Sequence, residues 1–349
     1  GFRGVFWMTS RSATSASRNR PSWSSSVASS TASQYALSSS SEMDIERGIS
    51  PARRDGNTGA VFVAFAVGST ATAAAAFYGP GVRAVRGDFP VPLDDVFIHF
   101  DFARSLCRAH PFEWIAGQGY SSGETSPLYA ACLAIGWAIG FRGGSLAVFA
   151  AAIACGSIAS AMLSLRGLMG RTHVAVACAA AALLVSIGAL DFSLFSGMEV
   201  ALFVALVFRA FVRADALVRA PPHLRAKNQW QLGALGAALV LTRPEAAVVV
   251  AVLAVLAARH ARSQSPLAAM ARVASPGAAA TLAIAGLNFA MTGDYASAGA
   301  RLKLLSSNPY LSDLDRAREL VLNVLSFDWR VLEASVVARP SFLLALAAV

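Results

Sequence analysis

The stretch Gly59-Ala-Val-Phe-Val-Ala-Phe-Ala-Val-Gly-Ser-Thr-Ala-Thr-Ala-Ala-Ala-Ala-Phe-Tyr-Gly79 decides the fold class, because it runs for 21 residues without a charge. At about 1.5 Å per residue, a helix of this length covers the roughly 30 Å hydrocarbon core of a bilayer. Of all 349 residues, 56% are hydrophobic and only 14% are charged, whereas a soluble domain carries about 25% charged residues. The sequence therefore predicts an all-α, polytopic transmembrane helix bundle.

Further apolar runs extend this bundle over residues 58–349, which we expect to form one transmembrane domain. They lie at 126–141, 146–164, 173–190, 197–212, 231–241, 245–258 and 274–291. Another begins at Ser341 and stops at Val349, which is too short to span, so we expect the C-terminal part of the domain to be missing.

Residues 1–57 have a different composition. Residues 1–41 hold fifteen serines, four arginines and no Asp or Glu, a mixture that cannot form a hydrophobic core. We expect 1–57 to be a disordered Ser/Arg-rich segment. Organellar transit peptides share this composition, but an upstream extension or a fragment, with Met43 as the start, is the simpler explanation.

Basic residues predict the orientation of the helices, because short loops rich in Lys and Arg stay cytoplasmic. The basic segments are 165–172, 213–227 and 259–272. The outer side then receives the loop 80–125, the turns 191–198 and 242–245, and the loop 292–340. Under this topology 126–164 makes an odd number of crossings, so one of its helices would be re-entrant or lie at the surface.

The same topology requires a hairpin over 231–258 with its tip at Thr242-Arg-Pro-Glu245. Pro244 favours a break there, because proline removes a backbone donor and clashes with the preceding turn. One long kinked helix is the alternative.

The sequence indicates neither nucleic-acid binding nor a disulfide or metal site. The net charge of +9 resides in short loops between apolar runs, where it reports topology, and no basic and aromatic patch predicts nucleic-acid binding. The four cysteines have no paired spacing, so we expect no disulfide and no cysteine metal site. The histidines also lack metal-ligand spacing, and no cofactor is predicted.

Most of the polar residues set among the apolar runs fall on the predicted outer side, which predicts an active-site cavity there. They are Asp94, Asp95, His99, Asp101, Glu124, Asp191, Glu199, Arg243, Glu245, Asp294, Arg301 and Lys303. The acidic pair follows two prolines that keep the chain extended. Asp94 is then a natural N-cap, and Asp95 and His99 share a face of a short interfacial helix. The alternative is that the pair only caps the helix and meets solvent.

Several motifs, in order, resemble polytopic GT-C glycosyltransferases, in particular the arabinofuranosyltransferase-like subgroup. The resemblance covers about residues 90–305 and rests on Leu93-Asp-Asp-Val-Phe-Ile-His-Phe-Asp-Phe-Ala-Arg-Ser-Leu106, His110-Pro-Phe-Glu-Trp114, Gly123-Glu-Thr-Ser-Pro-Leu-Tyr129, Phe195-Ser-Gly-Met-Glu-Val-Ala-Leu-Phe203, Leu241-Thr-Arg-Pro-Glu245 and the stretch from Gly293 to Leu304. The chain departs from the family at Asp101, Pro111 and Ala246, and it lacks the Pro-Asn usual near 294–303. These departures bear on the substrate more than on the reaction class.

The resemblance implies an inverting transferase in a multi-pass membrane domain, facing outward from a bacterial inner membrane. Its donor would be a sugar on polyprenyl phosphate, and its acceptor a glycan, lipid or protein. Asp94 would be the general base, with Asp95 as second choice. Arg243 would stabilise the leaving phosphate, with Arg301 and Lys303 as alternatives.

The remaining site candidates are Glu124, Glu199 and Glu245, which could hold sugar hydroxyls, and His99, which is grouped with the substrate-binding residues. A lone histidine is more often a satisfied interfacial residue than a catalyst. Glu199 and Arg243 could instead form mutual or local pairs. The competing functions are a secondary transporter with broken helices and a non-catalytic membrane subunit.

Overall fold

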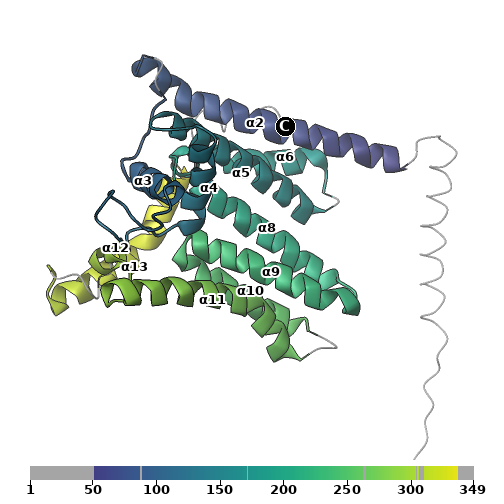
Figure 1. Ribbon diagram of the computed structural model, residues 1–349. Coiled ribbons are helices and arrows are strands. Elements are labelled where there is room, and N and C mark those ends of the chain that lie inside the picture. The colour runs from purple at the N-terminus through teal and green to yellow at the C-terminus, as the bar shows by residue number, and fades with distance from the viewer. Residues whose placement is uncertain are drawn as a thin grey trace, which may run out of the picture. The chain divides into compact units, whose positions relative to one another are not determined.

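Among the residues that it describes, the computed structural model contains three helices that are long and apolar enough to cross a membrane (Figure 1). They are residues Thr58–Ala84 of α2 (Pro51–Ala84), the whole of α5 (Ser145–Met169) and the whole of α11 (Pro266–Thr292). The structure describes residues 51–86, 89–170, 172–261, 265–303, 305 and 310–336, without the side chains of 51–57, 189, 301–303 and 327–336. Every named element in these ranges is a helix, as the sequence predicts.

Two predictions concern residues that the structure does not describe. Of the segment 1–57 that the sequence predicts to be disordered, residues 1–50 lie outside the described residues, whereas the backbone of 51–57 forms the start of α2. The final apolar run from Ser341 also lies outside the described residues.

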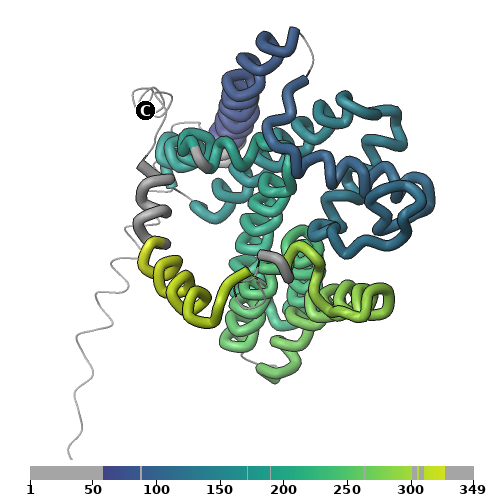
Figure 2. The backbone as a smooth tube through the Cα atoms, turned by 90° about the vertical axis from the view of Figure 1, so that its left-hand side faces the viewer, coloured from purple at the N-terminus to yellow at the C-terminus, as the bar shows by residue number. Residues whose placement is uncertain are grey.

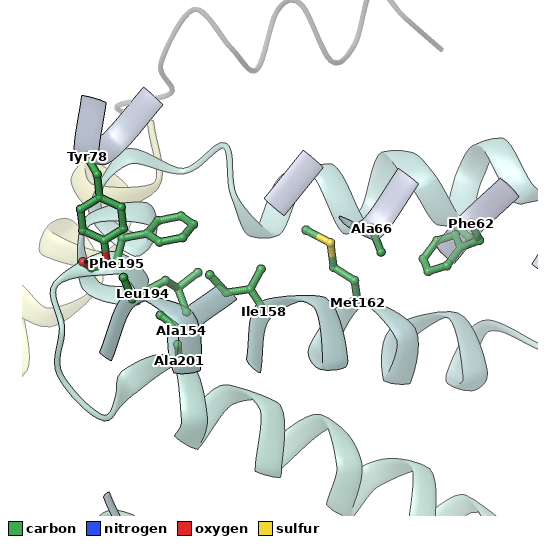
Figure 3. Close-up of a cluster of buried hydrophobic side chains, with 12 residues drawn as sticks. Phe62, Ala66, Tyr78, Ala154, Ile158, Met162, Leu194, Phe195 and Ala201 are labelled. Atoms are coloured by element: carbon green, nitrogen blue, oxygen red, sulfur yellow. Dashed lines mark hydrogen bonds between the residues drawn. The ribbon is translucent and has the colours of Figure 1, made fainter. Parts of the chain in front are cut away.

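The described residues from Thr58 onward belong to one compact unit. Its first core cluster joins α2 to α5. Phe62 and Ala66 of α2 pack with Ile158 and Met162 of α5 (Figure 3). At the other end of α2, the Tyr78 hydroxyl donates a hydrogen bond of 2.6 Å to the carbonyl of Phe195. The first apolar helix is thereby fixed to the segment that leads toward Glu199.

The apolar run 173–190 is not one helix. It divides into α6 (Val174–Leu184) and α7 (Gly188–Phe195). The turn predicted over 191–198 is therefore shorter, because α7 ends at Phe195. The connection to α8 (Val200–Arg219) consists of residues 196–199.

The helices α8 and α9 (Pro222–Thr242) follow each other with only Ala220 and Pro221 between them. The basic loop predicted over 213–227 is wrong in extent, because the tandem prolines 221 and 222 start α9 early. Arg225 of α9 is buried, and its Nε donates to the carbonyl of Ala220 at 3.0 Å. The basic segment 259–272 is likewise shortened, because α11 begins at Pro266.

The chain reverses at Arg243, as the hairpin prediction requires. Helix α9 ends at Thr242, Arg243 is extended at φ −150°, and the short 3₁₀ helix η1 (Pro244–Ala246) leads into α10 (Ala247–Arg259). A Cβ on Gly236 of α9 would lie 3.2 Å from Val250 of α10, so the two helices fold back on each other. The interpretation as one long kinked helix is wrong.

The first predicted loop contains α3 (Asp95–Cys107), which packs against α4 (Pro127–Ala138). Val96, Phe100 and Ala103 of α3 share a buried cluster with Tyr129 and Leu133 of α4. Twelve residues give α4 a length of roughly 18 Å, which is too short to cross a bilayer. Only α5 in the 126–164 region therefore has the length to span.

The last predicted outer loop, 292–340, also contains helices: α12 (Ala298–Lys303) and α13 (Asp313–Val336). The Tyr120 hydroxyl donates to Asn288 Oδ1 at 2.5 Å, and the Ala298 N–H donates to Ser122 Oγ at 3.1 Å. Figure 2 shows the first loop beside the C-terminal end of α11. The two long loops are therefore neighbours.

Candidate functional site

The acidic pair lies at the first turn of α3. Asp94 is the N-cap, and its Oδ1 accepts the N–H of Asp95 at 3.0 Å. Both carboxylates are exposed. The predicted capping role is confirmed, and the capping residues remain accessible to a bound molecule.

His99 lies one turn further along α3 and points into the protein, where only 4% of the residue is exposed. Its Nδ1 is 3.3 Å from Glu124 Oε1 and 3.4 Å from Glu124 Oε2. Its Nε2 is 3.5 Å from Glu199 Oε2. The ring of Tyr129 meets the imidazole edge-on, with 5.5 Å between the ring centroids. His99 thus sits between carboxylates from two distant segments.

Burial and the two carboxylates act in opposite directions on the pKa of His99. Burial alone lowers the pKa, but hydrogen bonds to Glu124 and Glu199 outweigh it and raise the pKa from 6.5 to about 9. For the Glu199 carboxyl, burial raises the pKa, while the contacts with His99 and Arg243 lower it further than burial raises it. Both pKa shifts favour an imidazolium facing ionised Glu199 at neutral pH.

Arg243 continues the cluster on the other side of Glu199. Its Nη1 lies 3.1 Å from Glu199 Oε1, and its Nε lies 3.6 Å from Glu245 Oε2. Glu199 and Arg243 therefore form the mutual pair that the sequence analysis gave as the alternative to substrate binding. The Arg243 side chain is still 39% exposed and that of Glu245 is 74% exposed, so this end of the cluster meets solvent.

Two residues that the sequence analysis did not assign to the site join the first loop to the hairpin tip. The Ser126 N–H donates to Glu124 Oε1 at 2.6 Å, and the Ser126 hydroxyl donates to the carbonyl of Thr242 at 2.7 Å. Ser126 and Thr242 have no exposed surface. Ser126 belongs to the motif Glu-Thr-Ser-Pro and Thr242 to the motif Thr-Arg-Pro-Glu. Their membership of these motifs is the sequence feature that could have assigned them to the site.

The turn before Glu199 is fixed by Gly197, whose φ is +88°. Its carbonyl accepts the hydroxyl of Tyr129 at 2.5 Å, and a Cβ there would lie 3.3 Å from Val96 Cγ1. Glycine suits this position because other residues rarely adopt a positive φ. Since Val96 follows the acidic pair, the first turn of α3 lies against the segment that carries Glu199.

Other candidates lie outside this cluster. Asp101 pairs with Arg104 on α3 at 3.0 Å, Asp294 accepts the N–H of Ala296 at 3.0 Å, and Asp191 is buried in α7. The side chains of Arg301 and Lys303 lie outside the described residues. The backbone of their helix begins at Ala298, which binds Ser122, two residues before Glu124.

The site therefore has an exposed rim and a buried support. The rim consists of Asp94, Asp95, Arg243 and Glu245, and the support consists of His99, Glu124, Ser126, Tyr129, Glu199 and Thr242. All four segments assigned to the outer side by the charge pattern contribute to it or contact it: the first loop, the turn before α8, the hairpin tip and the segment after α11. Their convergence is confirmed, while the membrane side that they face stays a prediction.

The exposed carboxylates of Asp94 and Asp95 can exchange a proton, and the partly exposed guanidinium of Arg243 can bind a phosphate. Comparison with known proteins adds no assignment: no protein-family model, no curated protein and no solved structure matches the chain.

Proposed function

We propose that the protein is a membrane glycosyltransferase of GT-C type, which transfers a sugar from a polyprenyl-phosphate donor to an extracytoplasmic glycan, lipid or protein acceptor. The observation that carries the proposal is the His99–Glu199–Arg243 contact chain. It links the helix that begins with the acidic pair to the hairpin tip that bears the guanidinium. The ordered motif resemblance supports the same reaction class.

In the proposed reaction an acceptor hydroxyl attacks the anomeric carbon of the donor sugar. A carboxylate of Asp94 or Asp95 takes the hydroxyl proton as the new carbon–oxygen bond forms. The bond between the anomeric carbon and the phosphate oxygen breaks, its electron pair stays on the phosphate, and the configuration inverts. The products are the glycosylated acceptor and polyprenyl phosphate.

Arg243 is the proposed partner of the leaving phosphate. A guanidinium can pair with two phosphate oxygens, and the 39% exposure of this side chain makes part of it accessible. Its contacts with Glu199 and Glu245 fix the group before a donor binds, which reduces the cost of ordering it. Arg301 and Lys303 remain alternatives for the same role.

Glu124, Glu199 and Glu245 are proposed to differ in their access to the sugar. Glu245 is mostly exposed and can accept hydroxyl hydrogens directly, whereas Glu124 and Glu199 are buried against His99. We assign the active site to the outer face of a bacterial inner membrane, in keeping with the basic segments on the other side.

The experiment uses the full chain in liposomes with radiolabelled polyprenyl-phosphate pentose and hexose donors. We expect labelled sugar to appear on an added glycan or lipid acceptor, together with free polyprenyl phosphate. A secondary transporter is the second candidate, favoured by the helix break at Arg243-Pro244 beside buried charges. Sugar uptake into the liposomes without any transfer to an acceptor would support the transporter and contradict the transferase.

A further inference from the structure

The two ring nitrogens of His99 face carboxylates that come from different parts of the chain. Glu124 lies at the end of the first loop, and Glu199 lies at the N-terminus of α8. The side chain of His99 is 6% exposed, and those of Glu124 and Glu199 are 2% and 7% exposed. A bound molecule therefore does not reach the ring without displacing protein groups.

When both carboxylates are ionised, this arrangement favours a proton on both nitrogens. An ionised carboxylate only accepts hydrogen bonds, and a neutral imidazole can donate from one nitrogen only. Its other nitrogen would present a lone pair to a second carboxylate. The charge of the imidazolium also compensates two buried anions, which would otherwise be costly.

We propose that His99 is a positioning residue: as an imidazolium it holds Glu124 and Glu199 together, and through Glu199 it fixes the guanidinium of Arg243 at the rim. The part of this proposal that concerns activity rests on the proposed function. The other part does not rest on it: protonated His99, through Glu124 and Glu199, connects α3 to the first loop and to the hairpin tip. We call this connection the interlock.

The groups around the ring support a structural cation. Glu124 faces it from the first loop, Glu199 from the turn before α8, and the Tyr129 ring from α4. Arg243 lies beyond Glu199, and Asp95 lies one turn earlier on the same helix. With a pKa of about 9, the ring already carries its proton at neutral pH and cannot accept another from an acceptor hydroxyl.

Glu199 transmits the effect to Arg243 because each of its oxygens serves a different partner. Oε2 faces His99 at 3.5 Å and Oε1 faces Arg243 at 3.1 Å. Loss of the imidazolium leaves Oε2 without its cation, so the carboxylate is free to rotate toward Arg243 alone. The guanidinium then loses its fixed orientation toward the rim.

The first test is histidine side-chain NMR on the wild-type chain in detergent, with His99→Gln to assign the resonance. We expect the His99 nitrogens to show an imidazolium at pH 7.5, with deprotonation near pH 9. A neutral imidazole at pH 7.5 would overturn the interlock, and this result does not depend on any enzymatic activity.

The second test is a double-mutant cycle on transfer from the polyprenyl-phosphate donor, with His99→Gln, Arg243→Lys and the combined variant. We expect each single substitution to lower kcat/KM for the donor at least tenfold. The kcat/KM of the combined variant should lie within threefold of that of the less active single variant. Fold-changes that multiply in the combined variant would overturn the positioning role.

The control for this cycle is His223→Gln, because His223 is an exposed residue of α9. We expect it to retain wild-type kcat/KM. Absence of transfer by the wild-type chain would count against the proposed function alone, since the NMR measurement decides the interlock separately.

Discussion

Arg243 Nη1 lies 3.1 Å from Glu199 Oε1, although the whole of α8 and α9 separates the two residues in the sequence. The pair joins the start of α8 to the end of α9, so it closes the two-helix unit at the end where the first loop docks. Because Glu199 also faces His99, the same carboxylate connects this unit to α3.

The Glu199–Arg243 pair should contribute to stability as well as to the site. Glu199→Gln leaves two cations facing a neutral amide, and we expect it to lower the free energy of unfolding by about 3 kcal/mol. Arg243→Gln should cost less, because its guanidinium is 39% exposed. Denaturant unfolding in detergent measures both variants.

The combined Glu199→Gln, Arg243→Gln variant is the control for direct coupling. We expect an interaction energy of about 1 kcal/mol or more, as is usual for contacting charges. Losses that simply add would mean that the pair does not act as a unit.

Stability should also fall at alkaline pH because of His99. Its folded-state pKa is raised from 6.5 to about 9, so the stabilisation is complete below about pH 6.5 and is lost as the pH rises through 9. The full effect is on the order of 3 kcal/mol. Thermal unfolding from pH 6 to pH 10 should show a fall in Tm that is absent in His99→Gln and unchanged in His223→Gln. An identical fall in His99→Gln would assign it to another group.

Gly197 should not tolerate a side chain. Its φ of +88° and the proximity of Val96 at 3.3 Å predict that Gly197→Ala destabilises the protein by about 1–2 kcal/mol. Gly286→Ala is the matched control, because a Cβ there meets nothing within 4 Å in the exposed face of α11. We expect the control to be neutral or slightly stabilising, and equal losses in both variants would contradict the account of this turn.

The orientation of the helices can be measured with single cysteines at exposed positions. We expect Gln118→Cys in the first loop to react with a membrane-impermeant maleimide from outside the cell, and His223→Cys at the start of α9 to react only after permeabilisation. The four native cysteines, of which Cys107 is exposed, are first replaced. Labelling of both positions from the same side would contradict the predicted topology.

Apolar run length and proline positions carried most of the fold prediction. The run 59–79, the break at Pro244 and the helix from Ser145 all agree with the sequence, because uninterrupted apolar segments and proline act locally. The division of 173–190 and the early start of α9 were not predicted. Prolines 221 and 222 mark the start of α9, but the sequence analysis assigned the charged residues after them to a loop, whereas Arg225 is buried within the helix.

The site was predicted as a set of residues but not as an arrangement. Motif order and charge topology brought His99, Glu124, Glu199, Arg243 and Glu245 to one end of the helices, and the structure joins them in one chain of contacts. Sequence spacing does not reveal that the histidine is buried between two glutamates. It also does not reveal the Ser126–Thr242 hydrogen bond, because both partners are distant in sequence and the acceptor is a backbone carbonyl.

The central claim, that the exposed acidic pair supplies the base for sugar transfer, is tested most directly by kcat for Asp94→Asn, Asp95→Asn and the double variant. Transfer from a polyprenyl-phosphate donor in liposomes is measured, with Asp101→Asn as the control because Asp101 lies on the same helix and pairs with Arg104. We predict a fall in kcat of about 10²–10⁴-fold for one of the single variants and for the double, as expected for loss of a general base, and less than a threefold change for the control. Full activity in both single variants and in the double would contradict the claim.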